Sequence, residues 1–477
     1  MIATFHILGT LRFLLSLVLI AATTSIYAQD DTEVIEIDYE AGDEYDFNAD
    51  DSYALPNWYT PGNGLRFSSS NQDYSMRITG YIQPYYERFF GSDTLGNDYA
   101  LTRYRVSRAR IKISGASSRL KLSYRLSFDL SRNNSIGDPI EVLDDNNNFL
   151  WDAFVTYKPL QYTRINIGQK APRTNYREFF MTSNTIQMVE RSRITSLFSV
   201  FRDVGLFIDH RQKIYRDLYM KSYLEITTGE GQNVWKNYGG LKYGGRVDIF
   251  PLGLFQGGEF NGVDMIREWK PKLVIGGAYS FIDGITNRNG NARTVAESFF
   301  YSDIDGNQVL PDYEKLIGDF MIKYRGFVIL GAYVKTRASV PTSITENEGT
   351  VRGRMNLGEI WNIQAGYLMK GDWSVDARYT KINDLAEQDA TGLITPQSET
   401  FLNAGIYDRP EYYTVGLTKY INKYAMKIQS SLTYNKVNTQ TGGDIRIYSQ
   451  DNLSGGSSID VAIPDEYTFR LTFSLAF

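Results

Sequence analysis

The chain has 477 residues, of which 42% are hydrophobic, 14% aromatic and 22% charged, and it contains no cysteine. The lack of cysteine excludes a disulfide framework, a thiolate zinc site and a thiol nucleophile. His6 and His210 are the only histidines, so clusters of imidazole metal ligands are excluded as well. The composition therefore predicts no metal ion, no cofactor and no catalytic residues, in a protein that is not an enzyme.

The first 28 residues are predicted to be a secretory signal peptide, and residues 29–65 an acidic flexible leader. Arg12 precedes a mostly apolar run over residues 13–22, which is shorter than the about 20 residues of a membrane-spanning helix. Between Asp30 and Asp51 the chain carries 11 acids and no base. From Ser52 onward it carries 49 Lys and Arg against 44 Asp and Glu, so the body of the protein is basic.

From Tyr74 onward, apolar residues recur at every second position over stretches of about ten residues. In the last stretch, Phe469, Leu471 and Phe473 alternate with polar residues. A period of two predicts strands with one apolar and one polar face. Sixteen strands are predicted, near residues 74–89, 101–113, 120–130, 149–157, 162–170, 202–209, 218–227, 239–249, 271–281, 316–324, 327–337, 360–369, 373–382, 412–420, 424–435 and 466–477.

The connections between these strands alternate between short turns, such as Arg325-Gly326, and long polar loops, such as 171–201 and 282–315. The long link 250–270 is an exception, because it falls where a short turn is expected. Tyr and Trp gather at the strand ends, as in the aromatic girdles of a membrane barrel. The pattern predicts an all-β fold over residues 66–477: a transmembrane β-barrel of the bacterial outer membrane, with about 16 antiparallel strands, short periplasmic turns and long extracellular loops.

In such a barrel the polar face lines the pore, so its charge determines which ions pass. Arg108, Arg110 and Lys112 share one face of a predicted strand, on which alternate side chains rise by about 7 Å. Planar guanidinium groups bind oxyanions with two parallel hydrogen bonds. The inward cations predicted to form an anion path are Arg108, Arg110, Lys112, Lys121, Arg125, Arg164, Lys170 and Arg378.

Two questions about the basic residues of this region leave alternatives open: which face of the strand Arg103 and Arg105 occupy, and whether the inward cations bind anions or pair with acids. Arg103 and Arg105 have the opposite phase, so they are predicted to lie beyond the lipid or to follow a bulge near Ser107. In the competing interpretation of the path, the inward cations pair with acids and only stiffen the wall. The acids available for such pairing are Asp129, Asp152 and Asp203.

Several short fragments, taken in order, resemble the phosphate-selective porin O and P family from about Gly80 to Phe477. They are Arg105-Val106-Ser107-Arg108-Ala109-Arg110-Ile111, Gly168-Gln169-Lys170-Ala171-Pro172, Met188-Val189-Glu190-Arg191-Ser192, Phe201-Arg202-Asp203-Val204-Gly205, Thr228-Gly229-Glu230-Gly231 and Ala377-Arg378-Tyr379-Thr380. The resemblance implies a sixteen-stranded barrel, usually trimeric, that passes anions with a preference for phosphate or polyphosphate.

By position, the resemblance also implies that residues 171–201 form the constriction loop inside the barrel. The residues implied in that loop are Arg173, Arg177, Glu190, Arg191 and Arg193. The chain departs from the family in one strand, where Val328, Leu330 and Ala332 stand at positions that are usually polar.

The sequence thus predicts an outer-membrane porin that allows passive diffusion of small anions. Two alternatives remain open: a general, weakly selective porin, and a non-porous barrel, plugged by loops 171–201 and 282–315, that acts as an adhesin or scaffold. The expected partners are outer-membrane lipid, small anions, two further copies in a homotrimer, and the barrel assembly machinery, whose sorting signal the C-terminal Phe477 resembles. No nucleic acid is expected, because the basic residues alternate along strands instead of forming a run.

Overall fold

The computed structural model describes residues 57–71, 73–92, 98–131, 149–233, 237, 239–285, 301–302, 308–339, 357–383, 411–436 and 466–477. The predicted signal peptide, most of the acidic leader and most of the predicted loop 282–315 lie outside the described residues. No helix within the described ranges is long and apolar enough to cross a membrane.

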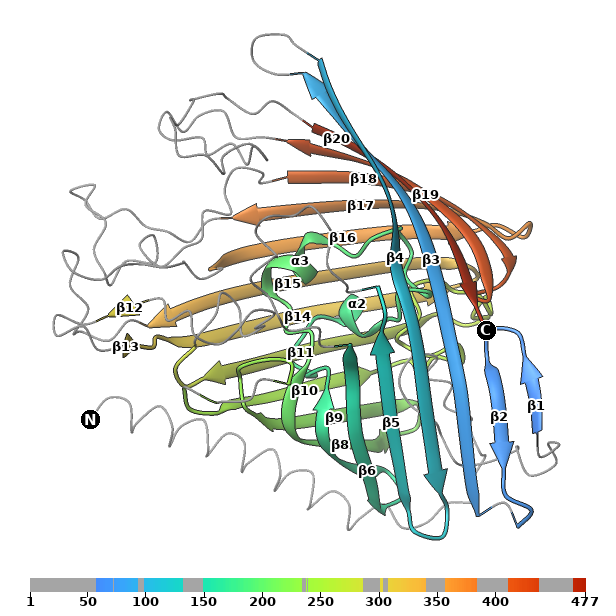
Figure 1. The fold of residues 1–477 in the computed structure, drawn as a ribbon, viewed down its shortest axis with the longest axis vertical. Helices are drawn as coiled ribbons and strands as arrows, with labels where there is room; N and C mark the ends of the chain where they lie inside the picture. Colours follow the sequence, from blue (N-terminus) through green and yellow to red (C-terminus); the bar gives the residue numbers. More distant parts are fainter. Residues whose placement is uncertain are drawn as a thin grey trace.

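The main sheet has 18 strands, and all of them except β1 (Asn57–Thr60) and β2 (Gly64–Ser68) form a closed antiparallel barrel of 16 (Figure 1). The last strand pairs with the first, which closes the barrel. The barrel strands are β3 (Tyr74–Ser92), β4 (Asp98–Ser117), β5 (Leu122–Asp129), β6 (Leu150–Leu160), β7 (Thr163–Lys170), β8 (Asp203–Tyr215), β9 (Leu218–Thr227), β10 (Lys242–Phe250), β11 (Lys272–Ile282), β14 (Asp312–Tyr324), β15 (Phe327–Ser339), β16 (Gly358–Leu368), β17 (Trp373–Asn383), β18 (Glu411–Asn422), β19 (Met426–Lys436) and β20 (Glu466–Ala476). The predicted fold class and all sixteen predicted strands are therefore confirmed. Residues Tyr301–Ser302 and Gln308–Val309 form a separate small pair, β12 and β13.

The alternating residues of each strand face lipid and lumen in turn, as β20 illustrates. Leu471, Phe473 and Leu475 are exposed on the outside, whereas Thr472 and Ser474 are buried inside the barrel. An apolar outer face suits the hydrocarbon of a membrane, and closure leaves no unpaired strand edge within it. The period of two in the sequence therefore correctly predicted which face of this strand meets lipid.

The N-terminal and C-terminal ends of the described chain meet at β3. The first part of β3 pairs with β2, and its later part pairs with β20. Phe477 exchanges two backbone hydrogen bonds of 2.8 Å with Gly80, which extends the seam by one residue beyond β20. The hairpin β1–β2 thus continues the sheet beyond the end of β20 (Figure 1). β1 and the first two residues of β2 belong to residues 29–65, the stretch that the sequence predicted to be the acidic leader.

A β-bulge in β4 reverses the phase of its side chains. Gln83 of β3 pairs with Arg108 and Pro84 pairs with Val106, so Ser107 is left without a partner in β3. An extra residue of this kind shifts every following side chain to the other face. Arg103 accordingly forms an ion pair with the buried Glu87. The bulge predicted near Ser107 is confirmed.

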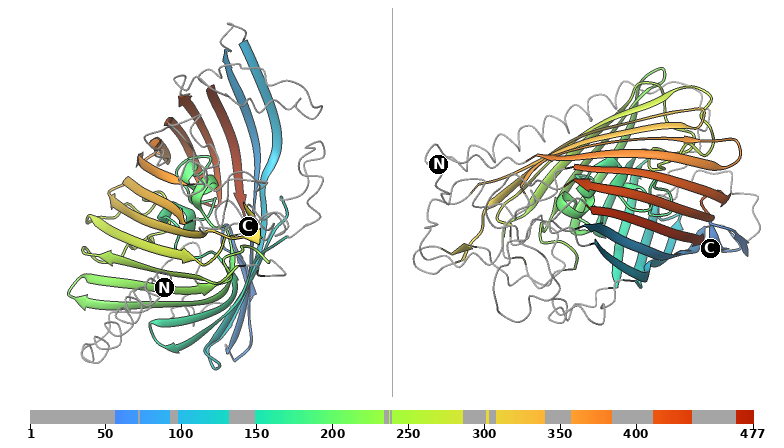
Figure 2. Two further views of the ribbon diagram at one scale, coloured as in Figure 1. Left: turned by 90° about the vertical axis from the view of Figure 1, so that its left-hand side faces the viewer. Right: turned by 90° about the horizontal axis from the view of Figure 1, so that it is seen from above.

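Two segments fold into the lumen from opposite ends of the barrel. Residues 171–202, from the loop end, include the short helices α2 (Arg177–Phe180) and α3 (Arg193–Phe198), which lie within the curve of the sheet (Figures 1 and 2). Residues 251–271 enter from the turn end, between β10 and β11. The backbone N–H of Gly262 donates to the carbonyl of Thr185 over 2.8 Å, so the two segments contact each other directly.

An apolar core inside the barrel joins both segments to one side of the wall. Phe180 and Phe260 pack edge to face, with ring centroids 5.6 Å apart. Burial of each such side chain contributes about 1.5–3 kcal/mol. The core comprises Tyr176, Phe179, Phe180, Met181, Ile186, Ile194, Leu197, Phe198, Phe250, Leu254, Phe255, Phe260, Val274, Ala278, Ile317, Met321, Leu330, Ala332, Val334, Ile360 and Ile382.

The core accounts for the apolar strand that departs from the family pattern. Val328, Leu330, Ala332 and Val334 of β15 are buried and face inward, and the last three belong to the core. A polar residue there would lose its hydration against Phe and Met side chains, so the apolar identities are what this interior requires. The side of the lumen formed by β10, β11 and β14–β17 is thus filled with protein.

Candidate functional site

Arg108 and Arg110, which we call the arginine ladder, lie on the inner wall of β4, opposite the apolar core. Arg108 reaches across to residues 171–202, where its Nη2 atom lies 2.5 Å from a carboxylate oxygen of Glu190. Arg110 forms an ion pair of 2.9 Å with Asp129 of β5. Both guanidinium groups of the ladder therefore hold a carboxylate, and for Arg110 this is the pairing that the competing interpretation predicted.

On the loop-end side of the bulge, β4 continues the ladder with two more arginines. Arg105 lies over the ring of Tyr85 at 5.1 Å, and Arg103 pairs with Glu87. Arg470 of β20 forms a 2.7 Å ion pair with the same Glu87. The sequence signal for these additional cations was the change of phase at Ser107.

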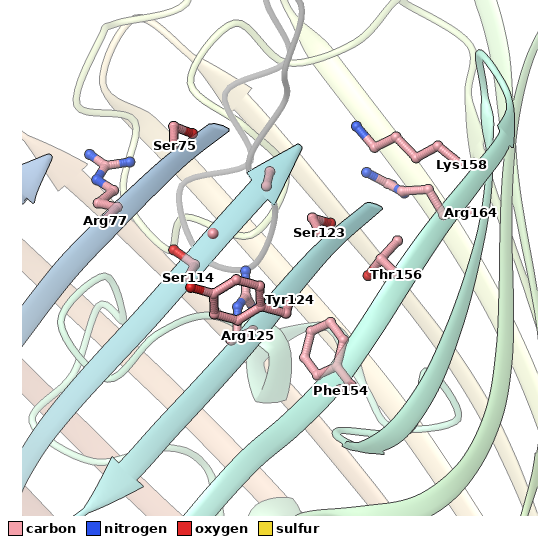
Figure 3. A pocket seen from close by; sticks show the side chains of 12 residues that line it. Ser75, Arg77, Ser114, Ser123, Tyr124, Arg125, Phe154, Thr156, Lys158 and Arg164 are labelled. Carbon is pink, nitrogen blue, oxygen red and sulfur yellow. The ribbon is translucent and has the colours of Figure 1, made fainter. Parts of the chain in front are cut away.

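At the turn end of the same wall, a cavity holds two of the other predicted path residues, Arg125 and Arg164. Four cations line it, together with serine and threonine hydroxyls, and its lining contains no acid. Figure 3 shows these side chains around the cavity, carried by β3, β5, β6 and β7. The lining residues are Ser75, Arg77, Ser114, Gly115, Ala116, Ser123, Tyr124, Arg125, Phe154, Thr156, Lys158 and Arg164. Arg77 and Lys158 were not among the predicted path residues.

The other predicted path residues occupy different surroundings. Lys112 lies on β4 between Arg110 and the cavity, and it pairs in register with Ser127. Lys170 lies at the end of β7, 3.7 Å from Asp209 and over the ring of Phe207. Lys121 is exposed in the turn before β5 instead of lying on the wall.

Residues 171–202 are anchored to the filled side of the barrel by a buried cluster of two arginines and two aspartates. Arg177 donates to Asp248 at 2.8 Å and to Asp319 at 3.1 Å. Arg246 of β10 donates to the same two carboxylates. All four side chains are 0% exposed, and their formal charges sum to zero. Such a charge-balanced cluster tolerates burial because every charge has a partner.

A second anchor ties the same segment to β17. Arg378 donates to Glu178 at 2.5 Å and to the carbonyl of Glu190 at 2.9 Å. Gln187 reaches Asp376 at 3.2 Å. Arg378, a predicted path residue, therefore positions the segment through contacts with two points along it, Glu178 and Glu190.

The remaining predicted residues of this segment differ in their environments. Arg191 donates to backbone carbonyls and to Ser183, and burial together with the nearby Arg108 and Arg110 lowers its pKa to about 10. Arg173 is buried over the rings of Phe180 and Phe260, whereas Arg193 is exposed on α3. Arg191 thus adds positive charge beside the ladder.

The inward course of residues 251–271 was not predicted. Their only sequence signal was their length, which exceeds that of the other turns. Lys221 pairs with Glu259 at 2.8 Å, and the Tyr424 hydroxyl donates to the carbonyl of Val263 at 3.0 Å. Asp264 accepts the backbone N–H of Gly326 at 2.7 Å. Contacts with β9, the β14–β15 turn and the β18–β19 turn thus fix the segment across the turn-end opening.

The described residues contain no group of three or more His, Cys, Asp or Glu side chains that could hold a metal ion. His210, the one histidine among the described residues, lies in β8, where its Nδ1 atom is 2.9 Å from the Thr163 hydroxyl.

A closed barrel with an apolar outer face and a polar wall inside is the architecture of bacterial outer-membrane proteins. The protein is a multi-pass β-barrel of the bacterial outer membrane. No model of a known protein family matches the chain, and no curated protein matches it.

Among solved structures, the chain is similar to an anion-selective porin from Comamonas acidovorans, with 10% identity, a TM-score of 0.46, and coverage of 85% of this chain and 100% of that chain. It is also similar to OmpF of Salmonella typhi in a complex with daunomycin, with 13% identity, a TM-score of 0.47 and coverage of 88% and 100%. The outer membrane channel DcaP of Acinetobacter baumannii gives 10% identity, a TM-score of 0.43 and coverage of 87% and 100%. These values are too low to carry an argument about solutes.

Proposed function

We propose that the protein is a porin that allows small anions to diffuse passively along the wall formed by β3–β7. The observation that carries this proposal is the cavity of Figure 3, whose lining holds four cations and no acid. Because the opposite side of the lumen is filled by the apolar core, a solute would pass beside the cations instead of through the centre of the barrel. Cations along a low-dielectric wall attract an anion in transit, and several weak sites in series avoid trapping it.

The solute class that fits this wall is a small oxyanion such as phosphate or polyphosphate. Arginine side chains offer paired N–H groups that match the oxygens of a phosphate, and the serine hydroxyls of the cavity add further donors. Chloride offers no such match. We therefore expect millimolar phosphate to reduce a chloride current through the protein.

The test is the reversal potential of the purified protein in a planar bilayer across a KCl gradient. Anion preference is expected for the native protein, and K158E with R164E should reduce or reverse it. K370E, in the exposed turn between β16 and β17, makes the same kind of charge change away from the wall and should leave the preference unchanged. Cation preference of the native protein would refute the proposal.

The second candidate function is a non-porous barrel that acts as an adhesin or scaffold. The observation that favours it is that two segments meet inside the lumen and form a continuous apolar core. Absence of steady conductance in the bilayer experiment would support this alternative over the porin.

Assembly as a homotrimer, and recognition of Phe477 by the barrel assembly machinery, form part of the same proposal. Native mass spectrometry of the detergent-solubilised protein would show the number of copies. F477A should lower the amount of protein that reaches the outer membrane, because it removes the terminal aromatic side chain that resembles the sorting signal and keeps the backbone hydrogen bonds with Gly80.

A further inference from the structure

Among the described residues, an aromatic residue followed directly by a cation that lies over its ring occurs at three places at the turn end of the barrel. Tyr215-Arg216 lies at the end of β8, Trp269-Lys270 lies just before β11, and Tyr324-Arg325 lies at the end of β14. In each pair the cation lies over the preceding ring, at 5.0, 4.3 and 5.1 Å from the ring centroid. The repetition at separate turns indicates a shared role.

A fourth pair of the same kind is built across two strands. Trp373 at the start of β17 is the register partner of Lys419 of β18, and the Lys419 ammonium lies 5.4 Å from the indole ring. With this pair, cation-capped rings occur on the turn end from β8 to β18.

The rings of these pairs lie outside the lumen. Tyr324 is 36% exposed and pairs with the exposed Phe327, whereas its neighbours Lys323 and Val328 are buried inside. Trp373 is 43% exposed, and the next residue, Ser374, is buried inside. Tyr215 and Trp269 are 63% and 62% exposed. Tyr and Trp on the outside of a barrel mark the level of the lipid headgroups.

The cations on these rings have no acidic partner among the residues that the structure describes. Within the part of the chain that the structure describes, Arg216, Lys270, Arg325 and Lys419 make no ion pair with a carboxylate. The opposite end differs, because Lys335 pairs there with Glu359 at 2.7 Å and Lys436 with Glu411 at 3.9 Å. Rings at that end stack on one another, as Tyr379 and Tyr413 do with centroids 4.9 Å apart. The cations over the turn-end rings therefore differ from Lys335 and Lys436, whose charges are each paired with a carboxylate.

A cation held over a ring is well placed to bind phosphate. The N–H groups of an arginine can donate to two oxygens of one phosphate, and a lysine ammonium group binds phosphate as a point charge. The ring also restricts the motion of the cation, so less freedom is lost on binding. A lipid headgroup that contains a phosphodiester and carries net negative charge fits this surface, because it lies at the level of the aromatic rings and would neutralise the cations.

We propose that the turn end of the barrel is a binding surface for anionic phospholipid in the adjoining leaflet, with headgroup phosphates held by Arg216, Lys270, Arg325 and Lys419. Each cation near an anionic membrane surface strengthens binding by about fivefold. This surface faces lipid and not the lumen, so it does not depend on what the barrel conducts.

The test uses the purified full-length protein in detergent with equimolar phosphatidylglycerol and phosphatidylcholine, and counts bound lipids by native mass spectrometry. Preferential retention of phosphatidylglycerol is expected. R216Q, K270Q and R325Q should each weaken that preference by about fivefold. Equal retention of both lipids by the native protein would overturn the proposal.

Two controls separate charge from folding. R325K keeps the positive charge and should keep most of the preference. K381Q removes an exposed cation from the opposite end of β17 and should leave the preference unchanged. If K381Q lowered the preference as much as R325Q, the turn-end surface would not be the binding site.

Discussion

The buried cluster around Arg177 predicts a large and specific effect of one substitution on the segment inside the lumen. Arg177 and Arg246 together neutralise Asp248 and Asp319, and all four side chains are fully buried. R177M removes one positive charge and leaves a net charge of −1 without access to water. Breaking a buried ion pair in this way costs about 3–5 kcal/mol, whereas an exposed pair is worth about 0–1 kcal/mol.

The matched control restores the balance of charge. D319N in the R177M background leaves Arg246 facing Asp248 alone, so the cluster is neutral again. The double variant then lacks only hydrogen bonds, which are worth about 0.5–1.5 kcal/mol each, and it should be more stable than R177M alone. A double-mutant cycle would measure this coupling directly.

Two assays report the outcome. Denaturant unfolding in detergent micelles measures the loss of stability, and single-channel recording measures conductance. We expect R177M to destabilise the protein and to raise conductance or its fluctuations, because residues 171–202 lose their main anchor on the filled side. A loss below about 1 kcal/mol with unchanged conductance would refute the reasoning, because it would mean that the cluster does not hold the segment.

Three further predictions concern the lumen. E190Q frees Arg108 from its carboxylate, so the reversal potential should show stronger anion preference than that of the native protein. Burial opposes ionisation of Glu190, but Arg108 and Arg470 outweigh it and hold the pKa of the Glu190 carboxyl below its ordinary value. A lowered pKa means that the pair persists at neutral pH and is lost only as the pH falls through that depressed value, so anion preference should rise in strong acid and E190Q should abolish the rise. L330A should cost about 2–5 kcal/mol in unfolding free energy because it opens a cavity in the apolar core, whereas I329A, which alters the lipid-facing neighbour, should cost less.

The controls and contrary outcomes for these predictions are direct. E359Q alters an outward carboxylate near the loop end and should not change ion preference. Unchanged selectivity in E190Q would remove the Arg108–Glu190 pair from the conduction path. Equal losses in L330A and I329A would show that the interior apolar core contributes nothing beyond ordinary strand packing.

The local pattern of the sequence was sufficient to predict the strands and their faces. Alternation along β20 follows from backbone geometry, since successive side chains of a strand point to opposite sides, and this holds whatever the strand pairs with. The same local rule indicated the bulge as one of two explanations, because Arg103 and Arg105 have the opposite phase to Arg108. β15 departs from the rule, because Leu330 and Ala332 make its inner face apolar as well as its outer face.

The partners inside the lumen were decided only by the closed barrel. Arg177 contacts Asp248 and Asp319, which are 71 and 142 residues further along the chain, and no local pattern connects them. The length of residues 251–271 was visible in the sequence, but their inward direction depends on contacts such as that of Tyr424 with Val263 across the opening.

The sequence by itself determined that the chain forms a barrel with an apolar outside and a polar inside, because both faces follow from the alternation of side chains along each strand. It did not determine which inward cations are neutralised or which part of the lumen is filled. Those properties depend on which residues closure brings within a few ångströms of one another, as with Arg108 and Glu190. Only the tertiary structure sets such distances.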